Sequence, residues 1–353
     1  MTRELYRADQ LPVFQNRMFS TAEAAQACAR GDVALVQDAQ TGLVFNSAFR
    51  PELMQYDADY QNEQAVSSVF RSHLDEITLI VERHFRSRSL IEVGCGKAYF
   101  LEHLQGLGFK ITGIDPAYEG DNPKVVKARF SREAGLQAEG LILRHVLEHI
   151  QQPADFLAEL HVANGGDGTI FIEVPCLDWI CSHRAWFDIF YEHVNYFRLD
   201  DFRRLFGRIH ESGHVFGGQY LYVVADLASL RDTAQAQTER FEFPADFAAS
   251  IGRFADRIRT RNAAAVVWGG ASKGVIFSLF MQRAGVRIDC VVDINPAKQG
   301  RYLPATGLRV SSPGEMLTQV AAGADIYVMN GNYLAEIRRM TQDKFNYMTV
   351  DHE

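Results

Sequence analysis

Hydrophobic and polar residues alternate along this chain in blocks that predict an α/β fold. Between residues 90 and 225, short apolar runs of strand length are separated by stretches with apolar residues at three- to four-residue steps, which is typical of amphipathic helices. This alternation favours a mostly parallel sheet with helices on both faces. We therefore expect a Rossmann-like, doubly wound sheet in this part of the chain.

The pattern changes on both sides of this region. Two modest strands in a loop-rich context predict a small lobe before it, and a strand, a glycine-rich turn, a helix and a strand recur after it. A chain of 353 residues is long enough for several lobes. The expected division is a small N-terminal lobe at 1–70, a nucleotide-binding domain at 71–230, a helical connector at 231–262 and a second Rossmann-like lobe at 263–353.

The most informative stretch runs from Ser89 to Asp115. An apolar strand enters the turn Gly94-Cys95-Gly96, an amphipathic helix follows, and a second strand, Lys110 to Ile114, leads into Asp115. Such glycines let a ligand contact the backbone at a helix N-terminus, and the terminal carboxylate can accept hydrogen bonds from ribose hydroxyls. The unit therefore predicts binding of an adenosine-containing ligand.

The third glycine position of a dinucleotide fingerprint distinguishes between possible ligands. It needs a small residue for close helix packing, and Tyr99 stands there, which argues against NAD or FAD. The shorter acid-x-Gly-x-Gly form from Glu92 to Gly96 resembles motif I of the class I S-adenosylmethionine-dependent methyltransferases. A purely structural two-glycine turn is the alternative.

Further polar residues follow the next strands of the predicted sheet. The segment RHVLEHI comes after the strand at 140–143, and Glu173 lies in the strand at 169–174. Carboxyl ends of parallel strands meet at one edge, so His145, Glu148, His149 and Glu173 are expected near the cofactor. H-x-x-E-H also resembles the inverted zinc-protease motif, but that motif needs both histidines on one long helix. Candidate cofactor-binding residues are Glu92, Gly94, Cys95, Gly96, Asp115 and His145.

Glu192 and His193 lie within the aromatic segment WFDIFYEHVNYF. Two ionisable groups among aromatic residues are costly to bury without a partner or a purpose. A carboxylate can orient an imidazole as a proton acceptor near neutral pH, and a structural pair is the alternative. Tyr60, before the first long helix, could donate to an oxyanion or simply pack against that helix.

The second glycine-rich unit contains WGGASKG and a strand that ends in Asp293, 19 residues after Gly274. It is not a P-loop, because Lys273 precedes the final glycine and Val275 replaces the Ser or Thr that would bind magnesium. Lys273 could still contact a phosphate, with turn N–H groups assisting. A ligand-free Rossmann-like lobe is the alternative. Candidate substrate-binding residues are Gly270, Lys273, Gly274, Asp293 and Asn330.

The composition of the chain argues against several kinds of binding partner, namely nucleic acid, an anionic membrane and zinc. A net charge of −8 without dense basic runs makes nucleic acid or an anionic membrane an unexpected partner. No run of about 18 apolar residues and no apolar leader is present, so a cytoplasmic location is expected. The five cysteines form no C-x-x-C, which supports neither a zinc knuckle nor a disulfide framework. Cys176 and Cys181, the closest pair, are expected to be packed thiols.

Several segments together resemble the nucleotide-sugar C-methyltransferases of deoxysugar biosynthesis over nearly the whole chain: IEVGCGKAYFLEHL, RHVLEHI, FIEVP, YEHVNYF, WGGASKG and VVDINPAKQGRYLP. The resemblance implies a small first lobe, a class I methyltransferase domain and a C-terminal Rossmann-like lobe that helps hold the nucleotide diphosphate. It also implies S-adenosyl-L-methionine as cofactor, a nucleotide-linked sugar as acceptor, and active-site roles for Glu192, His193 and His149.

Two departures from that family stand out. Zinc-binding cysteine pairs are expected in the first lobe, but Asp38 and Thr41 occupy the positions of one pair, so no metal is expected. The family's active-site tyrosine corresponds to Phe190, with Tyr191 adjacent. The acceptor, or the residue that acts as acid-base partner, could therefore differ from that of the family.

Methylation of carbon requires a base that removes a proton next to a carbonyl and a donor for the enolate oxygen. We expect His193 as base with Glu192 orienting it, and His149 with Tyr60 or Tyr191 as oxyanion partners. Methylation of oxygen or nitrogen on another small metabolite is one alternative, and a nucleotide-binding Rossmann protein without methyltransferase activity is another. The sequence defines neither the acceptor nor the oligomeric state.

Overall fold

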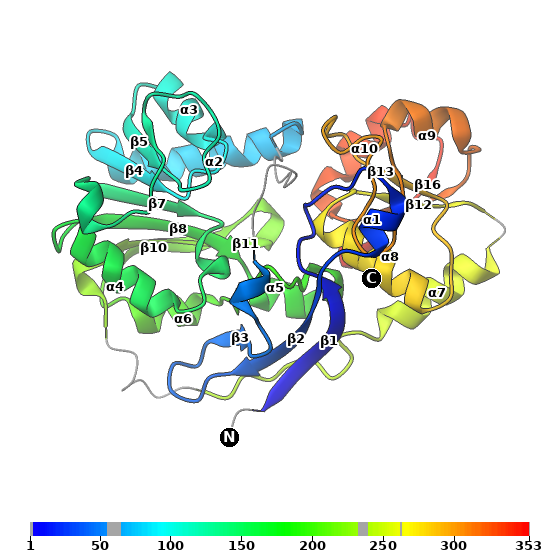
Figure 1. The fold of residues 1–353 in the computed structure, drawn as a ribbon, viewed down its shortest axis with the longest axis horizontal. Coiled ribbons are helices and arrows are strands. Elements are labelled where there is room, and N and C mark those ends of the chain that lie inside the picture. Colours follow the sequence, from blue (N-terminus) through cyan, green and yellow to red (C-terminus); the bar gives the residue numbers. More distant parts are fainter. Residues whose placement is uncertain (1–2, 55–64, 232–238, 262, 353) are drawn as a thin grey trace.

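The computed structural model describes residues 3–54, 65–231, 239–261 and 263–352, which form three β-sheets with flanking helices (Figure 1). The smallest is a four-stranded antiparallel sheet of order β1-β2-β3-β9, which lies below the two larger sheets in the view of Figure 1. Its elements are β1 (Glu4–Pro12), α1 (Ala22–Gln26), β2 (Arg30–Gln37), β3 (Val44–Asn46) and β9 (Asn195–Tyr196). The last strand comes from the aromatic segment far along the chain, which ties the first lobe to the central one.

The central sheet has seven strands in the order β10-β11-β8-β7-β4-β5-β6. Strands β4 to β8 are parallel, and β11 pairs antiparallel with β8 and with β10. Its strands are β4 (Ser89–Val93), β5 (Lys110–Ile114), β6 (Val125–Val126), β7 (Gly140–Arg144), β8 (Thr169–Pro175), β10 (Ile209–Val215) and β11 (Tyr220–Asp226); its helices are α2 (Ser68–Phe85), α3 (Tyr99–Gly106), α4 (Pro153–Ala163), α5 (Leu177–Ser182) and α6 (Leu199–Leu205).

This strand order confirms the predicted doubly wound α/β class. The predicted strand-turn-helix-strand unit is β4, α3 and β5, and α3 buries Phe100, Leu101 and Leu104 against the sheet. The strand order reverses at β4, which has β5 on one side and β7 on the other. Ligands of such sheets bind in the crevice beyond the carboxyl ends of the strands at this switch point.

The third sheet is fully parallel, with the order β14-β13-β12-β15-β16. Its elements are β12 (Ala265–Trp268), α8 (Ser272–Arg283), β13 (Cys290–Val292), β14 (Val310–Ser311), α9 (Pro313–Gln319), β15 (Asp325–Val328), α10 (Leu334–Met340) and β16 (Asn346–Thr349). The second Rossmann-like lobe is thus present. Its first helix begins at Ser272, three residues before the predicted start at Val275.

The helical prediction for the connector at 231–262 was wrong for much of the part that the structure describes. Helix α7 covers only Ser250–Thr260, and residues 239–249 contain no helix. Pro244 lacks a backbone N–H, and aromatic side chains here are used for packing: the rings of Phe243 and Phe247 lie 5.9 and 5.0 Å from that of Tyr6 in β1. Tertiary contacts therefore pack this segment on the first lobe without a helix.

One apolar core connects all three lobes. It includes Leu35 of the first sheet, Val174 of the second and Val267 of the third. The ring of Trp186, after α5, stacks on Phe277 of α8 at 5.8 Å, so the central and C-terminal lobes share buried aromatic contact. None of the helices that the structure describes combines the length and the apolar composition that crossing a bilayer requires.

Candidate active site

A cavity of about 380 Å³ lies between the central and C-terminal sheets. Loops after β4 and β7 line one side, and loops after β12, β13 and β15 line the other. The carboxyl edges of both parallel sheets therefore face the same space. The predicted site residues that line it are Glu92, Gly94, Cys95, Gly96, His145, His149, Glu192, His193, Lys273, Asp293 and Asn330.

The turn Gly94-Cys95-Gly96 has a backbone conformation that glycine adopts easily. Gly94 and Gly96 have φ of 73° and 53°, in the left-handed region. A Cβ on Gly94 would lie 2.5 Å from Val146 Cγ2, so this turn approaches the loop after β7 too closely for any side chain. Burial raises the pKa of the Cys95 thiol to about 12, so the thiol between the two glycines is protonated and packs as a small apolar group.

Asp115, at the end of β5, supports the same turn. Its Oδ2 accepts a hydrogen bond of 2.9 Å from Gly96 N, and its Oδ1 accepts one of 2.7 Å from Ala117 N. It is not among the residues that line the cavity. Each carboxylate oxygen retains a second lone pair, so ribose binding at Asp115 stays a prediction.

The segment after β7 forms a tight turn. His145 has φ of 52°, an uncommon value for a non-glycine residue, and Leu147–His149 form one 3-10 turn. The histidines are thus not on one long helix, which removes the zinc-protease alternative. His145 Nδ1 lies 3.2 Å from Glu148 Oε1, and His149 Nδ1 donates to the Glu192 carbonyl at 2.9 Å, which leaves His149 Nε2 with its lone pair.

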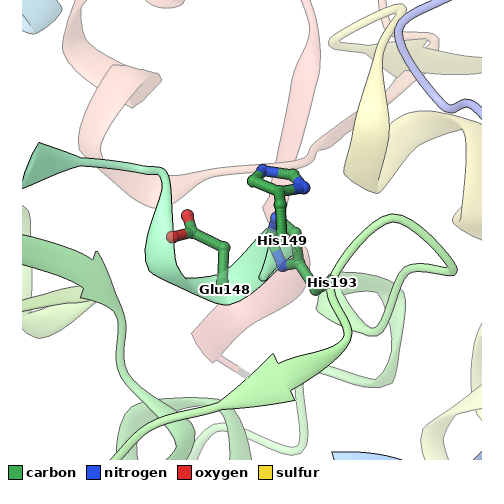
Figure 2. A group of neighbouring side chains, drawn as sticks. All are labelled: Glu148, His149 and His193. Carbon is green, nitrogen blue, oxygen red and sulfur yellow. The ribbon is translucent and has the colours of Figure 1, made fainter. Parts of the chain in front are cut away.

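His193 lies beside this turn, with Glu148 and His149 (Figure 2). One nitrogen or oxygen atom from each of the three lies within 4.8 Å of the others. Burial, reinforced by His149, lowers the pKa of His193 to about 3, while Glu148 opposes the shift. Although burial acts against it, the hydrogen bond from His145 and the nearby imidazoles hold the pKa of Glu148 below its usual value. A neutral imidazole therefore faces a carboxylate anion.

The same three groups could hold a divalent metal ion, because two imidazoles and a carboxylate are common ligands. In the ranges that the structure describes, no other group of His, Cys, Asp and Glu side chains has this property. The prediction that the enzyme uses no metal stays a prediction.

Glu192 was predicted to orient His193. In the structure its Oε1 accepts a 2.6 Å hydrogen bond from the backbone N–H of Gln15, so the carboxylate also holds the first lobe against the cavity. Glu148, which the sequence placed only by topology, is the carboxylate grouped with His193. The segment RHVLEHI signalled this residue, but its role depends on a turn geometry that spacing does not fix.

The two tyrosines that were predicted for the active site, Tyr60 and Tyr191, are not found at the cavity among the described residues. Tyr60 lies outside the described residues. Tyr191 is fully buried, its hydroxyl accepts from Arg50 N at 2.8 Å in the first lobe, and it does not line the cavity. Phe190 lines the cavity instead, with its ring 4.8 Å from that of His193. The structure thus does not bring Tyr191 to the predicted site. Tyr220, which the sequence analysis missed, does line the cavity.

On the C-terminal side, the cavity is bordered by the loops after β12 and β13 and by the start of α8. Gly270 N donates to Asp293 Oδ2 at 3.0 Å, and Lys298, only 4% exposed, has its Nζ 3.6 Å from the same oxygen. A Cβ on Gly274 would lie 1.8 Å from Gly269 O, so Gly274 serves close packing of α8 on the turn and does not itself line the cavity.

Lys273 is already paired inside the protein. Its Nζ lies 2.9 Å from Asp188 Oδ2 and donates to Gln219 Oε1 at 3.0 Å, over the ring of Trp179. Asn330 donates to the same Gln219 oxygen at 2.9 Å. Both predicted substrate-binding residues therefore line the cavity and also join the C-terminal lobe to the central one.

Arg144 is the main residue that the sequence analysis missed. It is the last residue of β7, lines the cavity and donates through Nε to Glu173 Oε2 at 2.6 Å. Glu173 is fully buried and also contacts His73 Nε2 at 2.6 Å. Glu173 thus fixes Arg144 at the cofactor edge, although it does not itself line the cavity.

Comparison with known proteins agrees with this architecture. A family model for a methyltransferase domain matches residues 63–209, and a model for the C-methyltransferase C-terminal domain matches residues 235–346. Together with the seven-stranded sheet, these matches show that the chain is a methyltransferase with a Rossmann-like central domain and a C-terminal lobe of the C-methyltransferase type.

One relative is the C-methyltransferase NovU of Streptomyces niveus. It is 24% identical over 290 residues, which cover 70% of this chain and 67% of NovU. The resemblance to C-methyltransferases that the motifs indicated is thereby confirmed.

Solved structures with similar parts include two methyltransferases. The 1,6-didemethyltoxoflavin-N1-methyltransferase of Burkholderia thailandensis, with bound 1,6-didemethyltoxoflavin and S-adenosylhomocysteine, is 15% identical with a TM-score of 0.34, over 54% of this chain and 96% of that one. An S-adenosylmethionine-dependent methyltransferase from Archaeoglobus fulgidus is 16% identical with a TM-score of 0.32, over 45% of this chain and 100% of its own.

Proposed function

We propose that this methyltransferase transfers a methyl group to a carbon atom next to a keto group of a small acceptor, a nucleotide-linked sugar. The observation that carries the proposal is the neutral imidazole of His193 beside the carboxylate of Glu148 in a cavity that two Rossmann-like lobes share. Methyl transfer to a carbon needs a base, and this pair supplies one at the edge where both ligands would meet.

The residues around the glycine turn fit the cofactor. A Cβ at Gly96 would meet nothing within 4 Å, so there is open space beside this backbone, and the buried Glu92 Oε2 has no hydrogen-bond partner. In the proposal, Gly94 to Gly96 contact the methionine part, and Asp115 accepts from the ribose hydroxyls. S-adenosylmethionine, when bound, supplies a methyl group on a positively charged sulfur.

His193 is the proposed base. It accepts the proton from the acceptor carbon next to the keto group, and the developing imidazolium is stabilised by the Glu148 anion. His149 is held through its Nδ1 by the Glu192 carbonyl, and in its imidazolium form, which adds a proton on Nε2, it donates a hydrogen bond from Nε2 to the enolate oxygen. The enolate carbon then forms a bond to the methyl carbon as the bond from that carbon to sulfur breaks.

The C-terminal lobe is the proposed site for the rest of the acceptor. Helix α8, of 12 residues, begins at Ser272 on the cavity, so its N-terminal N–H groups and partial positive charge face a bound anion. Lys298 adds a buried cation at the same edge. A diphosphate would suit this charge, and the sugar would then extend toward His193.

Labelled methyl donor tests the proposal directly. The protein is incubated with S-adenosylmethionine carrying ¹³C in its methyl group and with a nucleoside-diphosphate 4-keto-sugar, and the product is examined by NMR. We expect the labelled methyl signal to show one-bond coupling to a sugar carbon. A methyl resonance typical of an oxygen or nitrogen substituent would contradict carbon methylation while leaving the methyltransferase class intact.

A further inference from the structure

Two tyrosines from different lobes line the cavity. Tyr220 is the first residue of β11 in the central lobe, and Tyr333 ends the 3-10 turn after β15 in the C-terminal lobe. Both side chains are partly buried. Among the residues that the structure describes, neither hydroxyl makes a hydrogen bond. Phenol hydroxyls that are withdrawn from water usually have a partner, so a ligand in this cavity is expected to supply one.

Contact between the two lobes fixes both rings. The ring of Phe216 stacks on that of Tyr220 at 5.2 Å and meets that of Tyr333 edge-on at 5.7 Å. The C-terminal lobe also holds the backbone of Phe216, because Asn332 Nδ2 donates to its carbonyl at 2.9 Å. A Cβ on Gly217 would lie 2.5 Å from Asn332 Oδ1, so the two lobes approach each other closely at this point. The two phenols are therefore in place before a ligand binds, which lowers the entropy cost of binding.

Both phenols are neutral near neutral pH. Burial raises the pKa of Tyr220 well above its ordinary value, and Tyr333 reinforces the shift. Burial also raises the pKa of Tyr333, with Glu336 and Asp293 reinforcing the shift. A protonated phenol donates one hydrogen bond and can accept another, so this pair suits the hydroxyl and carbonyl groups of a neutral part of a ligand.

The pair connects the two ends of the proposed site. The ring of Tyr220 lies 4.6 Å from that of His145, which follows β7 on the side of the glycine turn. Tyr333 lies near Asp293, whose Oδ2 is 3.6 Å from Lys298 Nζ. Tyr220 is thus near the proposed cofactor end, and Tyr333 is near the proposed diphosphate end. In a nucleotide-linked sugar, the part between the diphosphate and the methylated carbon is the sugar ring.

We propose that Tyr220 and Tyr333 form a subsite for the sugar ring of the acceptor, in which the two phenol hydroxyls make hydrogen bonds with oxygen atoms of that ring. This inference rests on the proposed function and adds which residues select the sugar. Phe190, at the position of the family's tyrosine, brings no hydroxyl to the cavity, whereas this pair brings two. An acceptor without ring oxygens in reach would leave both phenols unpaired and would bind more weakly.

Two ligands that differ by the sugar ring test the subsite. A nucleoside-diphosphate 4-keto-6-deoxyglucose with thymidine or uridine carries the ring, and the nucleoside diphosphate with the same base lacks it. Binding of each to the whole chain, saturated with S-adenosylhomocysteine, is measured by titration calorimetry for the wild type, Tyr220→Phe and Tyr333→Phe. We expect each variant to weaken the nucleotide sugar about fivefold, the effect of one neutral hydrogen bond, and to leave the nucleoside diphosphate within twofold.

Tyr222→Phe is the matched control. Tyr222 lies two residues further along the same strand, and its hydroxyl donates to Glu211 at 2.8 Å away from the cavity, so neither affinity should change. Unchanged binding of the nucleotide sugar in either cavity variant, or an equal loss for both ligands, would overturn the subsite. Carbon methylation of the same sugar by the wild type would then leave the proposed function intact. If the wild type binds neither ligand, the proposed acceptor is wrong, and the subsite is wrong with it.

Discussion

At the scale of single residues, the environment of His193 decides its chemistry. The imidazole is neutral because burial lowers its pKa to about 3, and Glu148 is the nearby anion that can stabilise the charged form during proton transfer. We expect His193→Ala to lower turnover at least about 100-fold, the usual contribution of a general base, and to leave S-adenosylhomocysteine binding within a few-fold.

Parallel assays of methyl transfer and calorimetry check this prediction. His161→Ala is the matched control, since His161 contacts the Gly166 carbonyl far from the cavity and should behave as the wild type. Loss of cofactor binding in His193→Ala would show that this residue shapes the cofactor site and is not the base.

Glu92 gives the cofactor affinity a pH dependence. Burial raises its pKa to about 7, with Arg144 opposing and Asp115 reinforcing the shift. Below that pH the carboxyl group is protonated and cannot attract an ammonium group, so the affinity for S-adenosylhomocysteine should rise as the pH increases from 6 to 8. Calorimetry across this range measures it. In Glu92→Gln the rise should be absent, and an unchanged rise would assign the titration to another group.

Some of these site residues could be predicted from the sequence and others could not. The glycine turn, His149 and His193 follow from motifs, because a turn at the end of a parallel strand has few possible positions. Arg144 is the first residue of the segment RHVLEHI, but the direction of its side chain depends on the strand alternation and on Glu173, 29 residues away. Phe190 and Tyr191 are neighbours, and only the local backbone decides that Phe190 faces the cavity.

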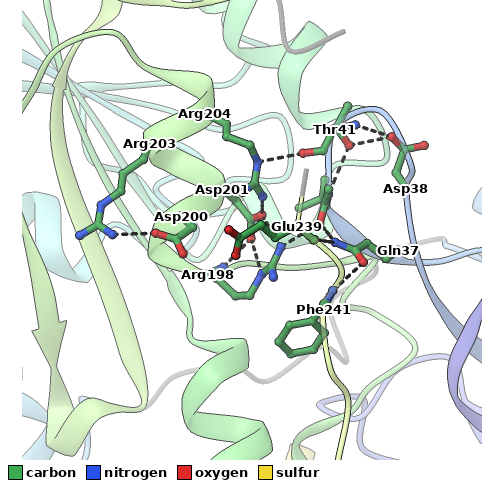
Figure 3. Close-up of polar contacts among 12 residues, drawn as sticks. Gln37, Asp38, Thr41, Arg198, Asp200, Asp201, Arg203, Arg204, Glu239 and Phe241 are labelled. Carbon is green, nitrogen blue, oxygen red and sulfur yellow. Dashed lines mark hydrogen bonds and ion pairs between the residues drawn. The ribbon is translucent and has the colours of Figure 1, made fainter. Parts of the chain in front are cut away.

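At the scale of elements, a polar turn closes the hairpin at Asp38 and Thr41, the positions where the resemblance to nucleotide-sugar C-methyltransferases implied a cysteine pair. Asp38 Oδ1 accepts from Gln40 N, Thr41 N and Thr41 Oγ1, at 3.0, 2.7 and 2.9 Å. Helix α6 holds the same turn, because Arg204 Nε donates to Thr41 O at 3.0 Å (Figure 3). Hydrogen bonds here therefore close the hairpin and connect it to α6.

Asp38→Ala should therefore destabilise the protein. Loss of three hydrogen bonds to a carboxylate is expected to lower the free energy of unfolding by about 1–3 kcal/mol. Thermal unfolding followed by calorimetry measures the change. Asp9→Ala removes an exposed ion pair with Arg7 on the same sheet and should have no measurable effect. If both variants unfold at the wild-type temperature, the turn does not stabilise the first lobe.

Helices and strands were predicted well in the buried central sheet. They were predicted poorly in the connector, where aromatic contacts between distant segments decide the structure. The strand at 110–114 was predicted with the bounds that the structure shows. The connector was predicted as helical throughout because Phe247, Ile251, Phe254 and Ile258 repeat at helical spacing, but α7 begins only at Ser250. Before it, Phe243 and Phe247 pack on Tyr6, and Phe241 N donates to Gln37 Oε1. Contacts between distant segments are not encoded in local spacing.

At the scale of the whole molecule, the cavity exists because the central and C-terminal lobes are held together. Lys273 of α8 pairs with Asp188 of the central lobe, and both side chains are largely buried. Glu336 of α10 accepts from the hydroxyls of Ser67 and Ser68 at 2.7 Å each, on the other side of the cavity. The contacts that hold the two lobes together therefore also shape the cavity.

Removing Lys273 should weaken this arrangement. Lys273→Met leaves Asp188 buried without its cation, which typically costs about 3–5 kcal/mol, and should lower the unfolding temperature measured by calorimetry. The double variant Lys273→Met with Asp188→Asn should recover part of the loss, because no unpaired charge remains. A normal unfolding temperature in Lys273→Met together with a raised KM for the acceptor would instead show that Lys273 mainly binds substrate.

Exchange of one acceptor proton tests the account most directly. The protein is saturated with S-adenosylhomocysteine, so that no methyl group can be transferred, and is incubated in D₂O with a nucleoside-diphosphate 4-keto-sugar. We predict that NMR will show enzyme-dependent loss of the proton signal at the carbon next to the keto group, and that His193→Ala will abolish this loss. Enzyme-dependent exchange that persists undiminished in His193→Ala, or methyl transfer to this acceptor by the wild type without any exchange, would contradict the proposed mechanism.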